Sequence, residues 1–168
     1  MNLVVVNGAP SAGKDTFVDM CIEYLDNHST KVSTVDPVKA IYEFFGWDGE
    51  KTPEARKWLS DCKDFLTTHG DLIWKFNAKL IDTWMISFPD STMFFFSREP
   101  EEIQRFVDYY DAITVCIRND KAAAVPTSNH ADAEVYNYQY ECYIDNNTTL
   151  EDLSWQAIDF CDTFLKGQ

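Results

Sequence analysis

A short apolar run, Leu3–Val6, is followed after one residue by the stretch GAPSAGK, which ends at Lys14. Gly8, Gly13 and Lys14 have the spacing G-x-x-x-x-G-K, in which glycines let the backbone turn tightly and approach an anion closely. An amphipathic segment begins at Lys14, so the positive end of a helix would face the same place. A strand, this loop and a helix, in that order, predict a nucleotide-binding loop rather than an incidental glycine turn.

The residues of the loop have separate expected contacts with ATP. Lys14 would place a full charge on the β and γ phosphates. The ATP-binding set also includes the other loop residues, with the Thr16 hydroxyl as a donor to an inner phosphate: Gly8, Ala9, Ser11, Ala12, Gly13, Asp15 and Thr16. In the common form of this loop a Ser or Thr follows the lysine and reaches Mg²⁺, but here Asp15 does. Asp15 would either bind Mg²⁺, directly or through water, or cap the helix, and both interpretations stay open.

Apolar patterns along the chain alternate between short β-like runs and longer helical stripes. Strands are expected at 3–6, 31–35, 92–96, 112–117 and 140–144, and helices at 14–25, 37–46, 53–70, 71–86, 100–109 and 148–165. This alternation predicts an α/β domain with a mostly parallel sheet, and 120–137 is expected to be an excursion from it. In two of the helices specific residues are expected on one apolar side: Leu72, Ile73, Phe76, Leu80 and Trp84 in the first, and Leu150, Leu153, Ile158, Phe160 and Phe164 in the second.

Composition limits the classes of partner. The chain has 14 Lys and Arg against 28 Asp and Glu, which argues against a general grip on nucleic acid but not against small anionic ligands. The N-terminus lacks a basic, apolar leader and no apolar run is long enough for a membrane span, so a cytoplasmic protein without a membrane partner is expected. Five cysteines without a C-x-x-C pair predict reduced thiols rather than zinc or a disulfide framework.

The stretch GAPSAGKDTF resembles the loop of a group of P-loop kinases that includes phage-type deoxynucleoside monophosphate kinases and animal-type phosphomevalonate kinases. STVDPVKAIYEFFG resembles the second strand, turn and helix of that family, and ARKWLSDCKDFLTTHGDLIWKF its acceptor-contacting helices. FFFSREPEEIQRFVDYYDAITVCIR resembles its strand–Arg–helix–strand–Arg unit, HADAEV its acidic lid, and YECYIDNNTTLEDL its final strand, Asn turn and helix.

The resemblance implies a P-loop NTPase fold of the nucleoside-monophosphate-kinase type, with three α/β/α layers and a five-stranded parallel sheet. It also implies one domain over 1–168, with an acceptor-binding helical region at about 37–88 and a lid at about 119–138. The implied reaction is phosphoryl transfer from ATP, with Mg²⁺, to a nucleoside or deoxynucleoside monophosphate, by a monomer or homodimer.

Four arginines occur in the chain: Arg56, Arg98, Arg105 and Arg118. Arg98 and Arg118 each follow an expected strand, at the edge where open α/β sheets bind ligands, and the planar guanidinium suits phosphate. Lys14, Arg118 and Arg98 are therefore the predicted catalytic residues. Lys14 and Arg118 would neutralise the transferred phosphoryl group, Arg118 would also contact ATP, and Arg98 would hold the acceptor phosphate. Arg105 is expected at the surface.

The remaining acceptor residues each have a plain alternative. Arg56 and Lys39 would help to hold the acceptor phosphate, or would be solvated helix charges. Asp36 would bind Mg²⁺ or the acceptor, or would cap the next helix. Asp132 and Glu134, at the acidic lid positions, would contact a cation or an arginine near the acceptor, or would belong to a polar loop.

Two further features affect the expected function. Asn146 follows the last expected strand, where a turn could pass the adenine ring of ATP. Relatives often carry Asp-x-Arg after the third strand, but here the stretch is Phe96-Ser97-Arg98. Metal binding would then rest on Asp15, Asp36, water and the phosphates.

The alternatives to a nucleotide kinase are a kinase for another small phosphomonoester, such as a mevalonate-type phosphate, and a non-catalytic nucleotide-binding protein. Four aromatic residues near the acceptor side would stack on a base, which favours nucleotides, or would be core: Tyr42, Trp47, Trp58 and Trp74.

Overall fold

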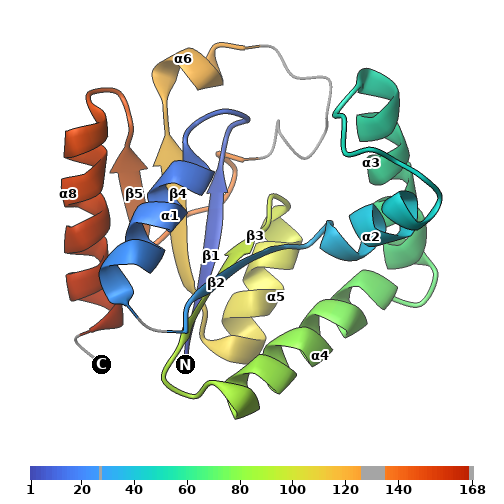
Figure 1. Cartoon of the computed structure of the whole chain (residues 1–168), viewed down its shortest axis with the longest axis horizontal. Coiled ribbons are helices and arrows are strands. Elements are labelled where there is room, and N and C mark those ends of the chain that lie inside the picture. The colour runs from blue at the N-terminus through green and yellow to red at the C-terminus, as the bar shows by residue number, and fades with distance from the viewer. Residues whose placement is uncertain (27, 126–134, 167–168) are drawn as a thin grey trace. The chain divides into compact units, whose positions relative to one another are not determined.

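The computed structural model describes residues 1–26, 28–125 and 135–166. The chain divides into two compact units, Met1–Val32 with Asp90–Gln168 and Ser33–Pro89 (Figure 1). The first contains a β-sheet with helices on it, and the second is helical. Among the described residues, no helix combines the length and the apolar character needed to cross a membrane.

One five-stranded parallel sheet forms the centre of the first unit, which confirms the expected α/β class. Its strands lie in the order β2-β3-β1-β4-β5, with these bounds: β1 Asn2–Gly8, β2 Thr30–Ser33, β3 Thr92–Phe96, β4 Ile113–Arg118 and β5 Cys142–Asp145. Val6 pairs with Phe96 of β3, and Gly8 pairs with Ile117 of β4. The loop after β1 therefore begins between the carboxyl ends of two neighbouring strands, which is where open α/β sheets bind ligands.

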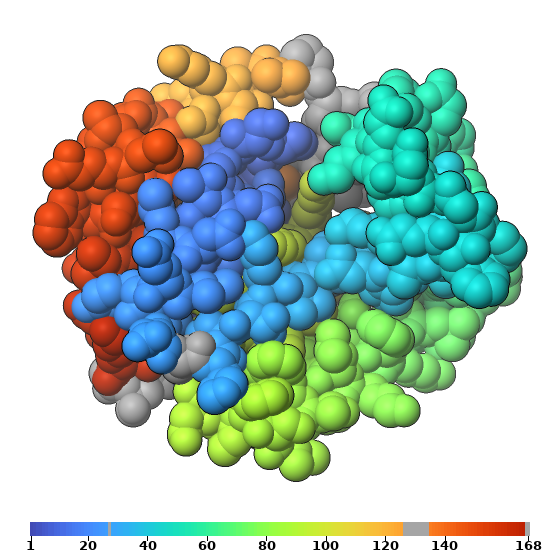
Figure 2. All heavy atoms as spheres, in the orientation of Figure 1, coloured from blue at the N-terminus to red at the C-terminus, as the bar shows by residue number. Residues whose placement is uncertain are grey.

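Helices cover both faces of this sheet because successive side chains of a strand point to opposite sides. Val4, Val6 and Phe94 face α1 (Lys14–Leu25) and α8 (Leu150–Phe160) in the main core cluster. On the other face the Phe95 ring lies 4.8 Å from that of Phe106 in α5 (Pro100–Tyr110). In Figure 2 α8 (red) packs beside α1 (blue). The first unit is thus a three-layer α/β/α structure.

The last helical segment begins with two cooperating caps. Thr149 accepts from the Asp152 backbone N–H, and the Asp152 carboxylate accepts from the Thr149 backbone in return. The helix continues through the π-helical segment η1 (Cys161–Leu165), whose neighbour Lys166 lies 3.6 Å over the Tyr24 ring. Leu153 and Phe160 are buried as expected, but Leu150 is 67% exposed because the first helical position faces solvent.

The structure corrects three other expectations in the sheet unit and its boundary. The strand expected at 31–35 ends at Ser33, because Val35 already precedes the first turn of the next helix. The strand expected from Tyr140 begins instead at Cys142. The excursion expected at 120–137 opens with a short helix, α6 (Asp120–Ala123), because the Asn119 side chain accepts from the Ala122 N–H at 3.0 Å and caps it.

The second unit consists of three helices, α2 (Asp36–Phe44), α3 (Pro53–Thr68) and α4 (Leu72–Ser87). Thr52 caps α3, and Pro53 takes the first position, where its missing N–H costs nothing. The Tyr42 ring stacks between two indoles, 5.0 Å from Trp47 and 4.1 Å from Trp58. The three rings therefore stack directly on one another in the structure.

Helix α4 buries only part of the side that the sequence predicts to face inward, with Ile73 buried as expected. Leu72 is 46% exposed and Phe76 is 51% exposed, whereas Ile73, Asn77 and Ile81 are buried. The buried residues are spaced by four, so they form one stripe that includes a polar residue. The apolar pattern did not predict that Asn77 is buried, because a carboxamide is polar and is not counted as a core residue.

Candidate functional site: the phosphate-binding loop

The loop between β1 and α1 has a backbone that only glycine fits at two points. Gly8 has φ 147°, and a Cβ there would collide with the carbonyl oxygen of Ile117. Gly13 has φ 98°, and a Cβ there would collide with the side-chain amide of Asn146. Ser11, at φ 63°, is also left-handed. Such alternation of backbone conformation forms a concave set of N–H groups that suits an anion.

The lysine of the motif lies within the loop. Lys14 Nζ donates to the carbonyl oxygens of Gly8 and Ala9, each at 2.7 Å. Gly13 stands before the first residue of α1 and no side chain caps that end. The first N–H groups of α1 and a lysine ammonium are therefore gathered at one place, and both favour a phosphate.

A second segment, after β5, clasps the loop. Asn146 Nδ2 donates to the Ala12 carbonyl oxygen at 2.8 Å, and the Asn146 backbone N–H donates to the Arg118 carbonyl oxygen at 2.8 Å. The Asn119 side chain donates in turn to the Asn146 carbonyl oxygen. The structure thus brings together three predicted ATP-binding elements: the loop, Asn146 and Arg118. The side chain of Asn146 supports the loop, and its expected contact with adenine stays a prediction.

Arg118 ends β4 with a guanidinium engaged on two sides. Its Nε lies 2.9 Å from Asp145 Oδ1, and its second nitrogen donates to Asp145 Oδ2 at 3.2 Å. The guanidinium carbon also lies 4.6 Å from the centre of the Tyr143 ring. The pair is 44% and 59% exposed, so solvent screens it and a stronger anion could compete for the arginine.

Asp15 projects into solvent from the first turn of α1, with its side chain 77% exposed and 3.7 Å from Lys31 Nζ. Lys31 makes its shorter contact, 2.7 Å, with Asp19. An exposed carboxylate beside the loop has the chemistry to bind Mg²⁺ directly or through water. Among the described residues no group of three or more His, Cys, Asp or Glu is arranged to hold a metal by itself, so a metal here would need phosphate and water ligands.

The predicted acceptor residues of the helical unit have local partners. Asp36 Oδ1 lies 2.7 Å from Lys39 Nζ, and Asp36 Oδ2 accepts from the Ser33 N–H at 2.7 Å. Both carboxylate oxygens are thus in use, but Asp36 does not cap α2, because Val35 precedes the helix and no side chain caps that end. The expected contact of Asp36 with Mg²⁺ or the acceptor stays a prediction. Arg56 donates from Nε to the Lys51 carbonyl oxygen at 3.1 Å and is exposed. Of the remaining candidates, Asp132 and Glu134 lie outside the described residues.

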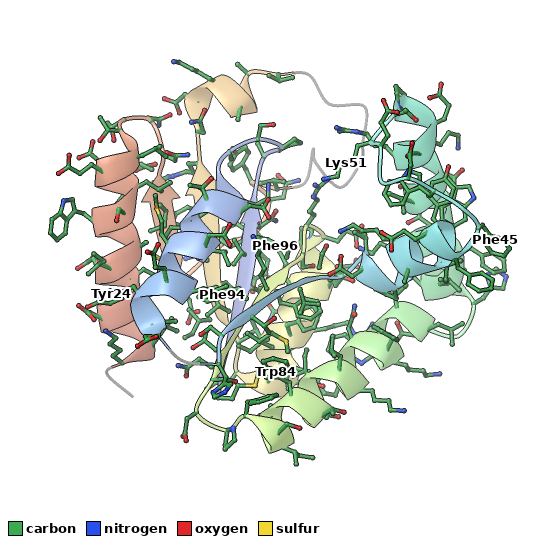
Figure 3. The ribbon with its side chains drawn as sticks, viewed as in Figure 1. Tyr24, Phe45, Lys51, Trp84, Phe94 and Phe96 are labelled. Carbon is green, nitrogen blue, oxygen red and sulfur yellow. The ribbon has the colours of Figure 1, made fainter. Side chains whose placement is uncertain are left out.

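The end of β3 differs from a metal-binding strand end. Phe96, labelled in Figure 3, packs against the core cluster of α1 and α8. Ser97 donates to Glu102 Oε2 at 2.6 Å. The backbone of Arg98 is held by Asn7 Nδ2, which donates to its carbonyl oxygen at 3.2 Å. The apolar ring of Phe96 therefore takes the position at which relatives often carry an Asp.

Charges near the loop also act on a buried thiol. Cys116 pairs in register with Asn7, and burial raises the pKa of its thiol to about 11, although the Arg118 and Lys14 cations pull the pKa down. Two of the three predicted catalytic cations, Lys14 and Arg118, thus act on this thiol, but burial has the larger effect and the thiol stays protonated at neutral pH.

Sequence reasoning missed four residues of this arrangement: Asn7, Asn119, Tyr140 and Asp145. A polar Asn7 closing an otherwise apolar strand was a usable signal, since a buried carboxamide needs partners. Tyr140 was hidden because it was assigned to a strand, and Asp145 because its partner lies 27 residues away.

Comparison with known proteins shows a shared fold at low sequence identity. No protein-family model matches the chain, and no curated protein matches it. A solved structure described as a "putative kinase" from Chloroflexus aurantiacus superposes with a TM-score of 0.51 at 10% identity, over 94% of this chain and 97% of that chain. A sugar kinase from Janibacter, solved without ligand, gives a TM-score of 0.49 at 12% identity, over 99% and 97%. The first of these supports a common fold.

Proposed function

We propose that the protein transfers a phosphoryl group from ATP to a small phosphorylated acceptor, a nucleoside or deoxynucleoside monophosphate. One observation carries the proposal: Lys14, two obligatory glycines and the uncapped start of α1 meet at the carboxyl end of the central strand. Such a loop binds a polyphosphate through amides and one cation. The fold shared with a protein described as a kinase agrees with it.

The roles of the residues follow from what phosphoryl transfer needs. Lys14 would leave the carbonyls of Gly8 and Ala9 for the β and γ phosphates, which are stronger acceptors. Arg118 would leave Asp145 for the charge that develops on the transferred group. Asp15 would hold Mg²⁺ through water, and the metal would neutralise phosphate charge. Arg98, Lys39 and Arg56 would hold the acceptor.

No general base is needed when the acceptor is already a phosphate, so the residues above suffice by positioning and charge. The three stacked rings of the helical unit would offer an aromatic surface to a nucleobase. This is the reason to favour a nucleotide acceptor over another small phosphomonoester.

A second candidate function is nucleotide binding without turnover. It is favoured by Phe96, which packs against the core cluster at the position where relatives often carry an Asp. The two candidates share the loop and differ in whether an acceptor is used.

The test is ADP formation from Mg-ATP with each ribo- and deoxyribonucleoside monophosphate and with phosphomevalonate. We expect acceptor-dependent turnover that Lys14→Ala lowers by at least ~100-fold. The matched control is Lys166→Ala, which removes a lysine near the other end of β1. Its neighbour Leu165 accepts a hydrogen bond from the Asn2 side chain, at the start of that strand, at 3.2 Å. ATP binding without stimulation by any acceptor would reject the kinase and support the second candidate.

A further inference from the structure

Asn7 stands immediately before Gly8 in β1, and it is fully buried. Its Oδ1 accepts from the Gly8 N–H at 2.8 Å. Its Nδ2 donates to the Tyr140 hydroxyl at 2.6 Å and to the Arg98 carbonyl oxygen at 3.2 Å. Both ends of one carboxamide are thus bonded, so the side chain cannot rotate without losing partners that are costly to leave unpaired.

Tyr140 extends this connection across the sheet. Its hydroxyl donates to the Val135 carbonyl oxygen at 2.7 Å, and its backbone N–H donates to the Tyr143 hydroxyl at 3.1 Å. The rings of Tyr140 and Tyr143 meet edge to face at 5.7 Å, and the Tyr143 ring carries the Arg118 guanidinium at 4.6 Å. A continuous series of contacts therefore runs from the first glycine of the loop to Arg118.

We propose that Asn7 and Tyr140 are positioning residues, which set the Gly8 peptide of the phosphate loop and hold it in register with Arg98 and Arg118. The inference rests on the proposed function, because it concerns the same phosphate site. Tyr140 fixes the carboxamide of Asn7, and the carboxamide fixes the Gly8 N–H before any ligand arrives. A loop that is already ordered loses less conformational entropy when it binds phosphate, so its affinity is higher.

The location of the pair argues against a purely structural role. Leu3–Val6, the preceding residues of β1, are all apolar and buried, and an apolar residue at position 7 would continue that core. The one buried polar side chain in this strand instead lies where the strand becomes the loop, and its three bonds reach Gly8 of the same strand, Arg98 after β3 and Tyr140 before β5.

Tyr140→Phe is the first test, because it removes the hydroxyl and keeps the ring. Its matched control is Tyr138→Phe, which removes a hydroxyl that donates to Gln104 at the surface, 3.1 Å away, on a ring that also touches Tyr140. Calorimetry would give the dissociation constants of ATP and of inorganic tripolyphosphate, well below the unfolding temperature. We expect Tyr140→Phe to weaken both ligands about tenfold, and Tyr138→Phe to change them less than about twofold.

Asn7→Asp is the second variant, and it tests the proposal even if Tyr140→Phe does not fold. The carboxylate can still accept from Gly8, but it cannot donate to Tyr140 or Arg98, and its charge opposes a phosphate. We expect tripolyphosphate binding to weaken by at least ~10-fold. The ratio of the ATP loss to the tripolyphosphate loss should stay near unity, because the effect lies in the phosphate loop and not at the base.

The outcomes separate the two proposals. A lower unfolding temperature with unchanged dissociation constants for both ligands would overturn the positioning role and leave the nucleotide site standing. A wild-type protein that binds neither ATP nor tripolyphosphate would overturn the proposed function itself, and the positioning role with it.

Discussion

Gly13 offers the sharpest test of the loop geometry, because two separate costs fall on one added methyl group. In Gly13→Ala the new residue must keep φ near 98°, where L-residues are strained. That strain costs about 1–3 kcal/mol. The new Cβ also collides with the Asn146 side-chain amide, which must swing away and give up its 2.8 Å bond to Ala12. The lost bond adds about 1 kcal/mol.

Gly46 supplies a control with the first cost alone. It has φ 94°, and an added Cβ would meet no atom within 4 Å. Gly46→Ala should therefore lose only the strain energy, about 1–3 kcal/mol. The excess loss in Gly13→Ala, about 1 kcal/mol, reports the contact with Asn146. Urea unfolding followed by circular dichroism gives both free energies.

The double variant Gly13→Ala/Asn146→Ala closes the cycle. Without the Asn146 amide the methyl group has space, so adding Gly13→Ala to Asn146→Ala should cost about 1 kcal/mol less than adding it to the wild type. The reasoning is refuted if Gly13→Ala lowers the free energy of unfolding equally in the two backgrounds, or if it lowers it no more than Gly46→Ala does. Either result would mean that the Asn146 side chain does not limit the space at Gly13.

Two further predictions concern pH and a buried amide. Burial raises the pKa of Cys116 from 9.0 to about 11 and also raises the pKa of Tyr140, so the protonated forms are favoured in the folded state. The contribution of Cys116 to the free energy of unfolding is therefore full below pH 9 and should be lost as the pH rises from 9 to 11. Urea midpoints across that range should show the fall, and Cys116→Ala should make it shallower; an equal slope would contradict the assignment. Both polar atoms of Asn77 are buried without a hydrogen-bond partner among the described residues, so Asn77→Leu should raise the free energy of unfolding by about 1–3 kcal/mol, and a loss of stability in the same urea assay would show that the amide has a partner in solution.

Local signals predicted much of the first unit. The apolar run and the glycine spacing placed β1, the loop and the start of α1, because a turn that needs positive φ leaves a mark in the sequence. Pro53 marked a helix start for a different reason, since proline fixes a negative φ and is favoured in the first turn. The α/β class followed from the alternation of the two periodicities.

Contacts between distant segments were beyond those signals. Asn146 is 134 residues away from Ala12 in the sequence, and Tyr140 is 133 residues away from Asn7. Helical and strand periodicities extend over only a few residues, so they cannot indicate such contacts. The pairing of Arg118 with Asp145 likewise depends on β4 and β5 lying side by side. The inward side of α4 was decided by its packing, which buried Asn77 and left Phe76 exposed.

The sequence by itself determined where the loop Gly8–Lys14 lies and which residue types compose it, because each depends on the conformational freedom of single residues and on their charge. The tertiary structure alone decided what holds that loop in place. Parallel pairing brings the ends of β1, β3 and β4 together with the segment before β5, and only there do Asn7, Tyr140 and Asn146 meet the backbone groups that they bind.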